Sequence, residues 1–210
     1  MDGNLLYYGD NLDVLREHIG DETVDLVYLD PPFKSNQDYN VLFAEHGVQA
    51  PAQIKAFEDT WRWDKSAAAT YDEVVTEGGR VADAMVAFRK FLGDNDMLAY
   101  LSMMAPRLME LRRVLKPTGS IYLHADPTAS HYLKMLMDSI FGATSFQNEI
   151  VWYYRGGGVS KGRFGRRHDI LLYYTRGTKH TFNVDAVRTG LTGHMPHGSG
   201  VPRFGIRRLF

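Results

Sequence analysis

Short apolar runs alternate along the chain with segments of helical periodicity, and this alternation is the strongest constraint on the fold. The first two runs, residues 5–9 (LLYYG) and 24–29 (VDLVYL), bracket residues 11–19, whose apolar side chains recur at helical spacing. A strand, a helix and a strand with short links predict a parallel pair joined by a right-handed crossover. The pattern therefore predicts an α/β fold.

The longest predicted helix covers residues 95–115. Its apolar residues are three or four positions apart: Met97, Leu101, Met104, Leu108, Leu111 and Leu115. Asn95 or Asp96 can cap its start, and residues 116–119 (KPTG) supply a stop. Pro106 lies inside the helix and predicts a kink or a break into two helices.

The second half of the chain continues the alternation. Residues 119–125, 148–154 and 169–175 read as strands, and residues 126–128 read as a turn into a helix that ends before Gly142. The later strands are expected to pair as antiparallel hairpins. Taken together, the elements predict a Rossmann-like sheet, largely parallel at first, with helices on both faces.

Two segments interrupt this pattern. Residues 34–79 are polar and aromatic without clear periodicity, which predicts an ordered, irregular insertion containing short helices. Residues 155–168 (RGGGVSKGRFGRRH) form a glycine-rich, strongly basic loop between two strands. Residues 181–210 show little periodicity, and we expect a truncated or altered C-terminal segment there, so that the sheet is incomplete on that side.

Composition excludes several classes of protein. The chain has no cysteine, so disulfides and thiolate metal sites are excluded. His194 and His197 are spaced like metal ligands but have no third ligand nearby, and we predict no metal site. The first residues lack the pattern of a signal peptide, and no apolar run is long enough to span a bilayer. We expect a cytoplasmic protein without membrane contacts.

Charge is distributed unevenly along the chain. Residues 1–150 carry a formal balance of −10 and residues 151–210 a balance of +9. A basic end on an acidic body is typical of a surface that faces a polyanion. A disordered basic tail is the alternative, but such tails are poor in aromatics and this segment is rich in them. We therefore predict a folded, nucleic-acid-facing surface in residues 151–180.

Polar groups follow three of the predicted strands, at Asp10-Asn11, at Asp30 and at His124-Ala125-Asp126. Ligands of doubly wound sheets bind beyond the carboxyl ends of the strands. We interpret the third group as a turn only. The second, Asp30-Pro31-Pro32-Phe33, is less easily explained as a turn, because two prolines and an aromatic ring directly follow a buried strand.

These four residues suit the recognition of an aromatic amine. Proline stiffens the backbone and presents carbonyl acceptors without a competing N–H, while Asp30 adds a carboxylate acceptor and Phe33 a flat apolar face. Acceptors that hold both amine hydrogens favour a pyramidal nitrogen whose lone pair can attack an electrophile. Inside a duplex the amine of adenine or cytosine is inaccessible, so the base has to be flipped out.

In these motifs the chain resembles the amino DNA methyltransferases, which transfer methyl from S-adenosylmethionine to N6 of adenine or N4 of cytosine. It is most similar to the circularly permuted beta group. The resemblance covers about the first 185 residues through LLYYGDNLDVL, DLVYLDPPFKSNQDYN, RVLKPTGSIYLHAD, SIFGATSFQNEIVW and RRHDILLYYT. It implies that residues 1–180 are the catalytic region.

The resemblance also implies roles for individual residues. Asp30, Pro31, Pro32 and Phe33 match the catalytic motif. Asp10 and Asn11, together with Asp30, match positions that contact the cofactor. Seven residues lie where the family faces double-stranded DNA: Lys34, Arg155, Lys161, Arg163, Arg166, Arg167 and His168.

One expected motif is absent from the sequence. The permuted group carries a Phe-x-Gly-x-Gly cofactor loop after the target-recognition segment, and no glycine string here follows a strand and opens a helix. Several readings therefore stay open: an adenine methyltransferase, a cytosine-N4 enzyme, an enzyme acting on RNA or protein, or a non-catalytic DNA-binding partner subunit. A homodimer or a second chain could complete the sheet, and a restriction system would add an endonuclease partner.

Overall fold

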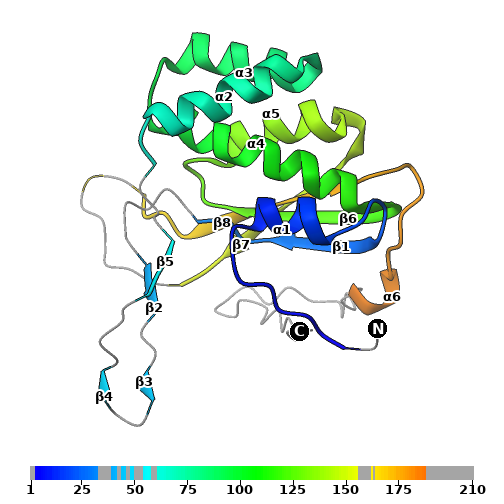
Figure 1. Ribbon diagram of the computed structural model, residues 1–210. Coiled ribbons are helices and arrows are strands. Elements are labelled where there is room, and N and C mark those ends of the chain that lie inside the picture. Colours follow the sequence, from blue (N-terminus) through cyan, green and yellow to red (C-terminus); the bar gives the residue numbers. More distant parts are fainter. Residues whose placement is uncertain are drawn as a thin grey trace.

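The computed structural model describes residues 3–32, 61–155, 162 and 164–187, together with the backbone of short strands between residues 39 and 57. Its centre is a four-stranded sheet with the order β1-β6-β8-β7 (Figure 1). The bounds of these strands are β1 (Val24–Leu29), β6 (Leu115–Ala125), β7 (Phe146–Tyr153) and β8 (His168–Thr175).

The sheet is mixed. β1 and β6 are parallel, with Tyr28 beside Tyr122, whereas β8 is antiparallel to both β6 and β7. The predicted antiparallel hairpin of the later strands is therefore confirmed. β6 begins four residues earlier than expected, because Leu115 already pairs with Val24 of β1.

Helices cover the two faces of the sheet unequally. One face of the sheet is covered in Figure 1 by α2 (Lys65–Glu77), α3 (Gly79–Leu92), α4 (Asp96–Val114) and α5 (Ser130–Phe141). On the same side, α1 (Asn11–His18) packs beside α4. The other side carries the short α6 (Val184–Val187) and the segment before it, where Phe182 stacks on Tyr173 of β8. The predicted α/β class is confirmed.

α4 is the central helix of the core. It is a single helix of 19 residues that continues through Pro106 without breaking into two. The side chain of Asn95 accepts a hydrogen bond from the Leu98 N–H at 3.0 Å, as the capping pattern predicts. Leu98, Leu101 and Leu108 are fully buried. None of the helices in the described ranges is long and apolar enough to cross a membrane.

The buried face of the sheet follows the period of two expected for strands. Ile121 and Leu123 of β6 and Leu172 of β8 have no exposed surface and meet the helices. The opposite face is aromatic and partly open. There Tyr122 and Tyr173 stack at 4.5 Å between ring centroids, and Tyr28 is 58% exposed.

The prediction of a strand at residues 5–9 is wrong. These residues belong to no strand, and Leu6 and Tyr8 are almost fully exposed. An apolar run becomes a strand only where a neighbouring strand can take up its backbone hydrogen bonds. In the described sheet β1 pairs with β6, and residues 5–9 pair with no strand, so the predicted parallel pairing of residues 5–9 with β1 does not occur.

The interval from residue 34 to 79 contains more strand than expected. Four short strands occur in its first part: β2 (Tyr39–Val41), β3 (Ala44–Glu45), β4 (Val48–Gln49) and β5 (Ile54–Phe57). β2 pairs with β5 and β3 with β4, in each case antiparallel. The helix within the interval is α2, whose start is capped by Asp64 accepting from Ala67 N–H at 2.9 Å. The proposed domain boundaries stay a prediction.

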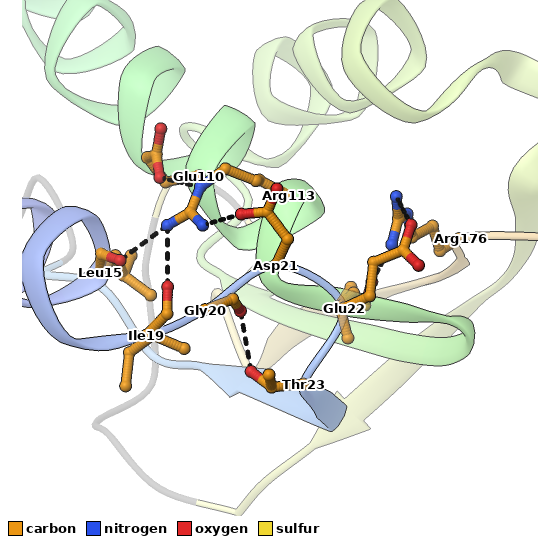
Figure 2. A network of polar contacts seen from close by, with 10 residues as sticks. Leu15, Ile19, Gly20, Asp21, Glu22, Thr23, Glu110, Arg113 and Arg176 are labelled. Atoms are coloured by element: carbon orange, nitrogen blue, oxygen red, sulfur yellow. Dashed lines mark hydrogen bonds and ion pairs between the residues drawn. The ribbon is translucent and has the colours of Figure 1, made fainter.

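Arg113 joins α4 to the turn between α1 and β1 (Figure 2). Its guanidinium donates to Glu110 Oε2 at 2.6 Å and to the Leu15 and Ile19 carbonyls at 2.7 and 3.1 Å, and it pairs with Asp21. The hydrogen bonds to Asp21 and to Glu110 raise the pKa of Arg113 further above its ordinary value. Beside this cluster Arg176 pairs with Glu22 at 2.7 Å (Figure 2), which ties the end of β8 to the same turn.

We predict that Arg113→Ala lowers the free energy of unfolding by about 2 kcal/mol. The substitution removes the guanidinium that donates hydrogen bonds to two backbone carbonyls and two carboxylates in the native protein. Urea unfolding measures the change. Arg112→Ala is the matched control, since Arg112 is an exposed neighbour on the same helix and should change stability by less than about 0.5 kcal/mol. Equal effects of the two variants would contradict the prediction.

Candidate functional site

Asp30 lies directly beyond the end of β1 and faces outward. Its side chain is 58% exposed, while Pro31 behind it is buried and Pro32 is half-buried. The buried ring of Pro31 holds the backbone in place, so that the carboxylate projects from a stiff support. Phe33 and Lys34 lie outside the described residues.

His124 of β6 lies between two carboxylates. Because Tyr28 pairs with Tyr122 in parallel register, residue 30 comes level with residue 124 on the same face. The imidazole Nδ1 is 3.2 Å from Asp30 Oδ1, and Nε2 is 3.5 Å from Asp169 Oδ2 of β8. The side chains of His124 and Asp169 are only 17% and 19% exposed. Three neighbouring strands thus place a carboxylate, an imidazole and a carboxylate in a row.

Two tyrosines flank this row. Burial raises the pKa of Tyr28, and the nearby charge of Asp30 raises it further. The pKa of Tyr154, which follows β7, is also raised, first by burial and then by the charge of Asp169 and a hydrogen bond to it. The row therefore extends to the fourth strand.

The ends of the basic loop meet at this edge of the sheet. The Tyr154 N–H donates to the Arg167 carbonyl at 3.0 Å, which continues the β7–β8 ladder by one step. Arg155 and Arg166 are exposed, whereas Arg167 and His168 are half-buried. The structure thus brings four of the predicted DNA-facing residues to one place. Lys161 and Arg163 lie outside the described residues.

Asp10 and Asn11 are held at the start of α1. Asp10 Oδ1 caps the helix by accepting from the Leu12 N–H at 2.8 Å. Arg107 of α4 donates through Nη2 to both carboxylate oxygens of Asp10 at 2.7 Å and through Nε to Asn11 Oδ1 at 2.8 Å. The side chain of Asp10 remains 49% exposed. Both residues therefore have a structural role, and their contact with the cofactor stays a prediction.

Sequence reasoning missed three residues of this region: Arg107, His124 and Asp169. For Asp126 the interpretation as a turn is confirmed, because its carboxylate accepts from the Thr128 and Ala129 N–H groups at 3.2 and 3.1 Å. His124 is two residues earlier on the strand and faces Asp30 instead. Its position one step before a strand end was a usable signal. Asp169 and Arg107 carried none, because their partners are far away in sequence.

No cluster of three or more His, Asp and Glu side chains suited to a metal ion occurs in the described ranges. His194 and His197 lie outside them. The groups that the structure places at the sheet edge are carboxylate and carbonyl acceptors, an imidazole behind them and guanidinium groups beside them. That set suits a ligand with an amine to donate and phosphates to neutralise.

Comparison with known proteins identifies the family. A family model described as DNA methylase, of the N6/N4 methyltransferase type, matches residues 24–195. This chain is a member of the N6/N4 DNA methylase family. The match confirms the resemblance to amino DNA methyltransferases, whereas the permuted order of motifs stays a prediction.

Curated relatives of this methylase are subunits and enzymes of restriction-modification systems. The Mod subunit of the type III enzyme StyLTI from Salmonella typhimurium is 33% identical over 71% of this chain and 20% of its own length. The type II methyltransferase M.KpnI from Klebsiella pneumoniae is 25% identical over 80% of this chain and 31% of its own length. The methylase chain thus spans about a fifth to a third of these relatives.

Among solved structures, the cytosine-N4-specific PvuII DNA methyltransferase aligns with this chain. The two share 14% sequence identity at a TM-score of 0.47, over 86% of this chain and 52% of that one.

We predict that Asp30→Asn lowers the pKa of Tyr28, because removing the carboxylate charge removes one of the two causes that raise it. Burial remains, so the pKa should stay above that of an exposed tyrosine. NMR titration of the chain labelled with ¹³C at the tyrosine Cζ measures the change. Asp25→Asn on the same strand is the control, since Asp25 pairs with Lys116 at 2.8 Å. A Tyr28 pKa that is the same in both variants would contradict the prediction.

Proposed function

We propose that this chain carries the catalytic region of a DNA methyltransferase that uses S-adenosylmethionine and methylates the exocyclic amine of a flipped-out base. The observation that carries the proposal is the exposed Asp30 carboxylate, held on a buried proline beyond the end of β1 in a member of the N6/N4 family. N6 of adenine is the favoured target.

Asp30 would act as an acceptor for the target amine. Its carboxylate would take one amine hydrogen and the Pro31 carbonyl the other, while Phe33 would stack on the base. Two acceptors would localise the nitrogen lone pair and make the amine a nucleophile for direct transfer of the methyl group. The sulfur of the cofactor would keep the electrons of the broken S–CH3 bond, and the methylated amine would lose one proton. No covalent bond between enzyme and base is required, in keeping with a chain that has no cysteine.

The residues near α1 fit the adenosine part of the cofactor. Asp10 accepts three hydrogen bonds, and a carboxylate has about four acceptor positions, so one remains for an amine. Asn11 uses its side-chain oxygen on Arg107 and keeps its amide N–H₂ for donation. Bound S-adenosylmethionine supplies an electrophilic methyl group. Arg107 would hold both acceptors in place before the cofactor arrives.

DNA would lie along the basic end of the sheet. Arg155 and Arg166 are exposed next to the row that begins at Asp30, and such side chains neutralise phosphates. The neighbouring aromatic side chains Trp152 and Tyr153 are 42% and 56% exposed and offer additional contact area. Contacts to phosphates position the DNA and carry no sequence information by themselves.

Adenine is preferred over cytosine because the catalytic motif begins with Asp, whereas many cytosine-N4 enzymes of the family have Ser there. The two targets share all the chemistry above, and RNA or protein amides could in principle present a similar amine. Methyl transfer is compared between a duplex whose only acceptor amine is that of adenine and a duplex whose only acceptor amine is that of cytosine. RNA and protein are tested as further acceptors, and the comparison separates these substrates.

A second candidate function is that of a DNA-binding partner subunit. In the described part of the chain, β1 pairs with a strand on one side only, so the edge of the sheet next to Asp30 is open. A second copy or another chain could supply further strands and a wall of the cofactor site. A restriction endonuclease is a further possible partner, in line with the restriction-modification names of the relatives. Calorimetry with S-adenosylmethionine discriminates the two functions, because the partner subunit alone would not bind it.

We predict that Asp30→Ala reduces methyl transfer to DNA by about 100-fold or more while leaving the affinity for DNA unchanged, because the carboxylate acts on the reacting amine and not on phosphates. Transfer of tritiated methyl groups and a gel-shift titration measure the two properties. Asp25→Ala is the control, an exposed carboxylate on the same strand. Normal transfer by Asp30→Ala would exclude the proposed mechanism.

We predict that replacing Arg155 and Arg166 by Ala weakens binding of all DNA sequences alike and flattens its salt dependence. Each lost phosphate contact should reduce the slope of log K against log salt by about 0.9. Lys90→Ala tests the effect of charge alone, since Lys90 is exposed on α3. A double variant with the salt slope of the unmodified chain would show that the loop does not contact phosphates.

A further inference from the structure

The imidazole of His124 has an arrangement that packing alone does not explain. It lies on the central strand β6 and contacts the strand on either side through a different ring nitrogen, Asp30 at 3.2 Å and Asp169 at 3.5 Å. Its side chain is 17% exposed, so the ring has little freedom to turn. A buried ring with a carboxylate oxygen close to each of its two nitrogens is suited to orienting one of those carboxylates.

The two carboxylates differ in their surroundings. The side chain of Asp30 is 58% exposed, whereas that of Asp169 is 19% exposed and is hydrogen-bonded to the Tyr154 side chain. The buried side of the row is therefore anchored and the exposed side is presented to a ligand.

We propose that His124 is a positioning residue for Asp30. In the protonated ring both nitrogens are donors. Its Nδ1–H engages Oδ1 of Asp30 and so leaves Oδ2 as the acceptor aimed at the target amine, while its Nε2–H faces Asp169, which sets the orientation of the ring. Hydrogen bonds of this kind are often long before the substrate arrives and shorten in the complex, which fits contacts of 3.2 and 3.5 Å.

The inference rests on the proposed function, since it assigns His124 a role in the same reaction. It goes beyond that function by linking the acceptor on β1 to the base of the basic loop. Tyr154, which contacts Asp169, is bonded through its N–H to Arg167. The ends of all four strands thus contribute to the placement of one carboxylate oxygen.

Two substitutions at His124 test the two contacts separately. The side-chain amide nitrogen of Asn lies near the position of imidazole Nδ1, and that of Gln lies near Nε2. His124→Asn therefore keeps a donor for Asp30, whereas His124→Gln keeps one only for Asp169. We expect His124→Asn to retain kcat within about threefold and His124→Gln to lower kcat by about 10- to 100-fold, with KM for DNA and cofactor unchanged.

Tyr122→Phe is the matched control, because Tyr122 is on the same face of β6, one step before His124 along that face. It should leave kcat unchanged. Equal kcat in His124→Asn and His124→Gln would overturn the proposal. It would also be overturned if both variants lost thermal stability to an extent that explains their loss of activity. Asp30→Ala in the same assay separates failure of the proposed function from failure of the positioning role. If Asp30→Ala stays active, the proposed function fails. If Asp30→Ala is inactive but His124→Gln stays active, only the positioning role fails.

A second measurement needs no turnover. Long-range ¹H–¹⁵N NMR spectra of the histidine-labelled chain report each ring nitrogen, and the spectrum of His124→Gln assigns the signals of His124. Asp30→Asn should shift the Nδ1 signal more than the Nε2 signal, and Asp169→Asn should do the reverse. Signals that respond to neither substitution would show that the contacts are absent and would overturn the proposal.

Discussion

The parallel pairing of β1 with β6 determines where the functional side chains of this methylase lie. Side chains alternate between the faces of a strand, so the register of this pair decides which face receives each residue. With Tyr28 beside Tyr122, Val27 and Leu29 face the helices while Asp30 and His124 share the open face. A slip by one residue would bury the carboxylate in the core and expose the aliphatic side chains.

The core maintains this register from one side only. α4 and α5 bury Ile121, Leu123 and Leu172, and the Arg113 cluster fastens the turn that leads into β1. The opposite face carries stacked tyrosines and the row of polar groups. The sheet is thus supported by packed helices on one face and carries the row of polar side chains on the other. A preorganised acceptor needs such a rigid support. Among the described strands, β1 remains the unpaired edge on the side away from β6.

The elements that were predicted correctly are those with strong periodicity and local stop signals. α4, α5, β7 and β8 were located within a few residues, and the cap at Asn95 was identified from its residue type. Residues 5–9 were predicted as a strand and are not one, because an apolar run has no preference for strand without a partner for its hydrogen bonds. The short strands of residues 39–57 were missed because they have too few residues for periodicity to be visible.

The sequence by itself determined the residue types from which the chemistry is predicted. The order Asp-Pro-Pro after an apolar strand, together with a basic loop between two later strands, was sufficient to predict an amine-binding carboxylate and a surface for DNA, since residue type and local stiffness are properties of neighbouring residues. Only the tertiary structure decided what surrounds that carboxylate. Asp30, His124 and Asp169 are far apart in the chain and meet because three strands pair in one register, and Arg107 reaches Asp10 because α4 packs beside α1. Contacts between distant residues depend on packing, which no local pattern encodes.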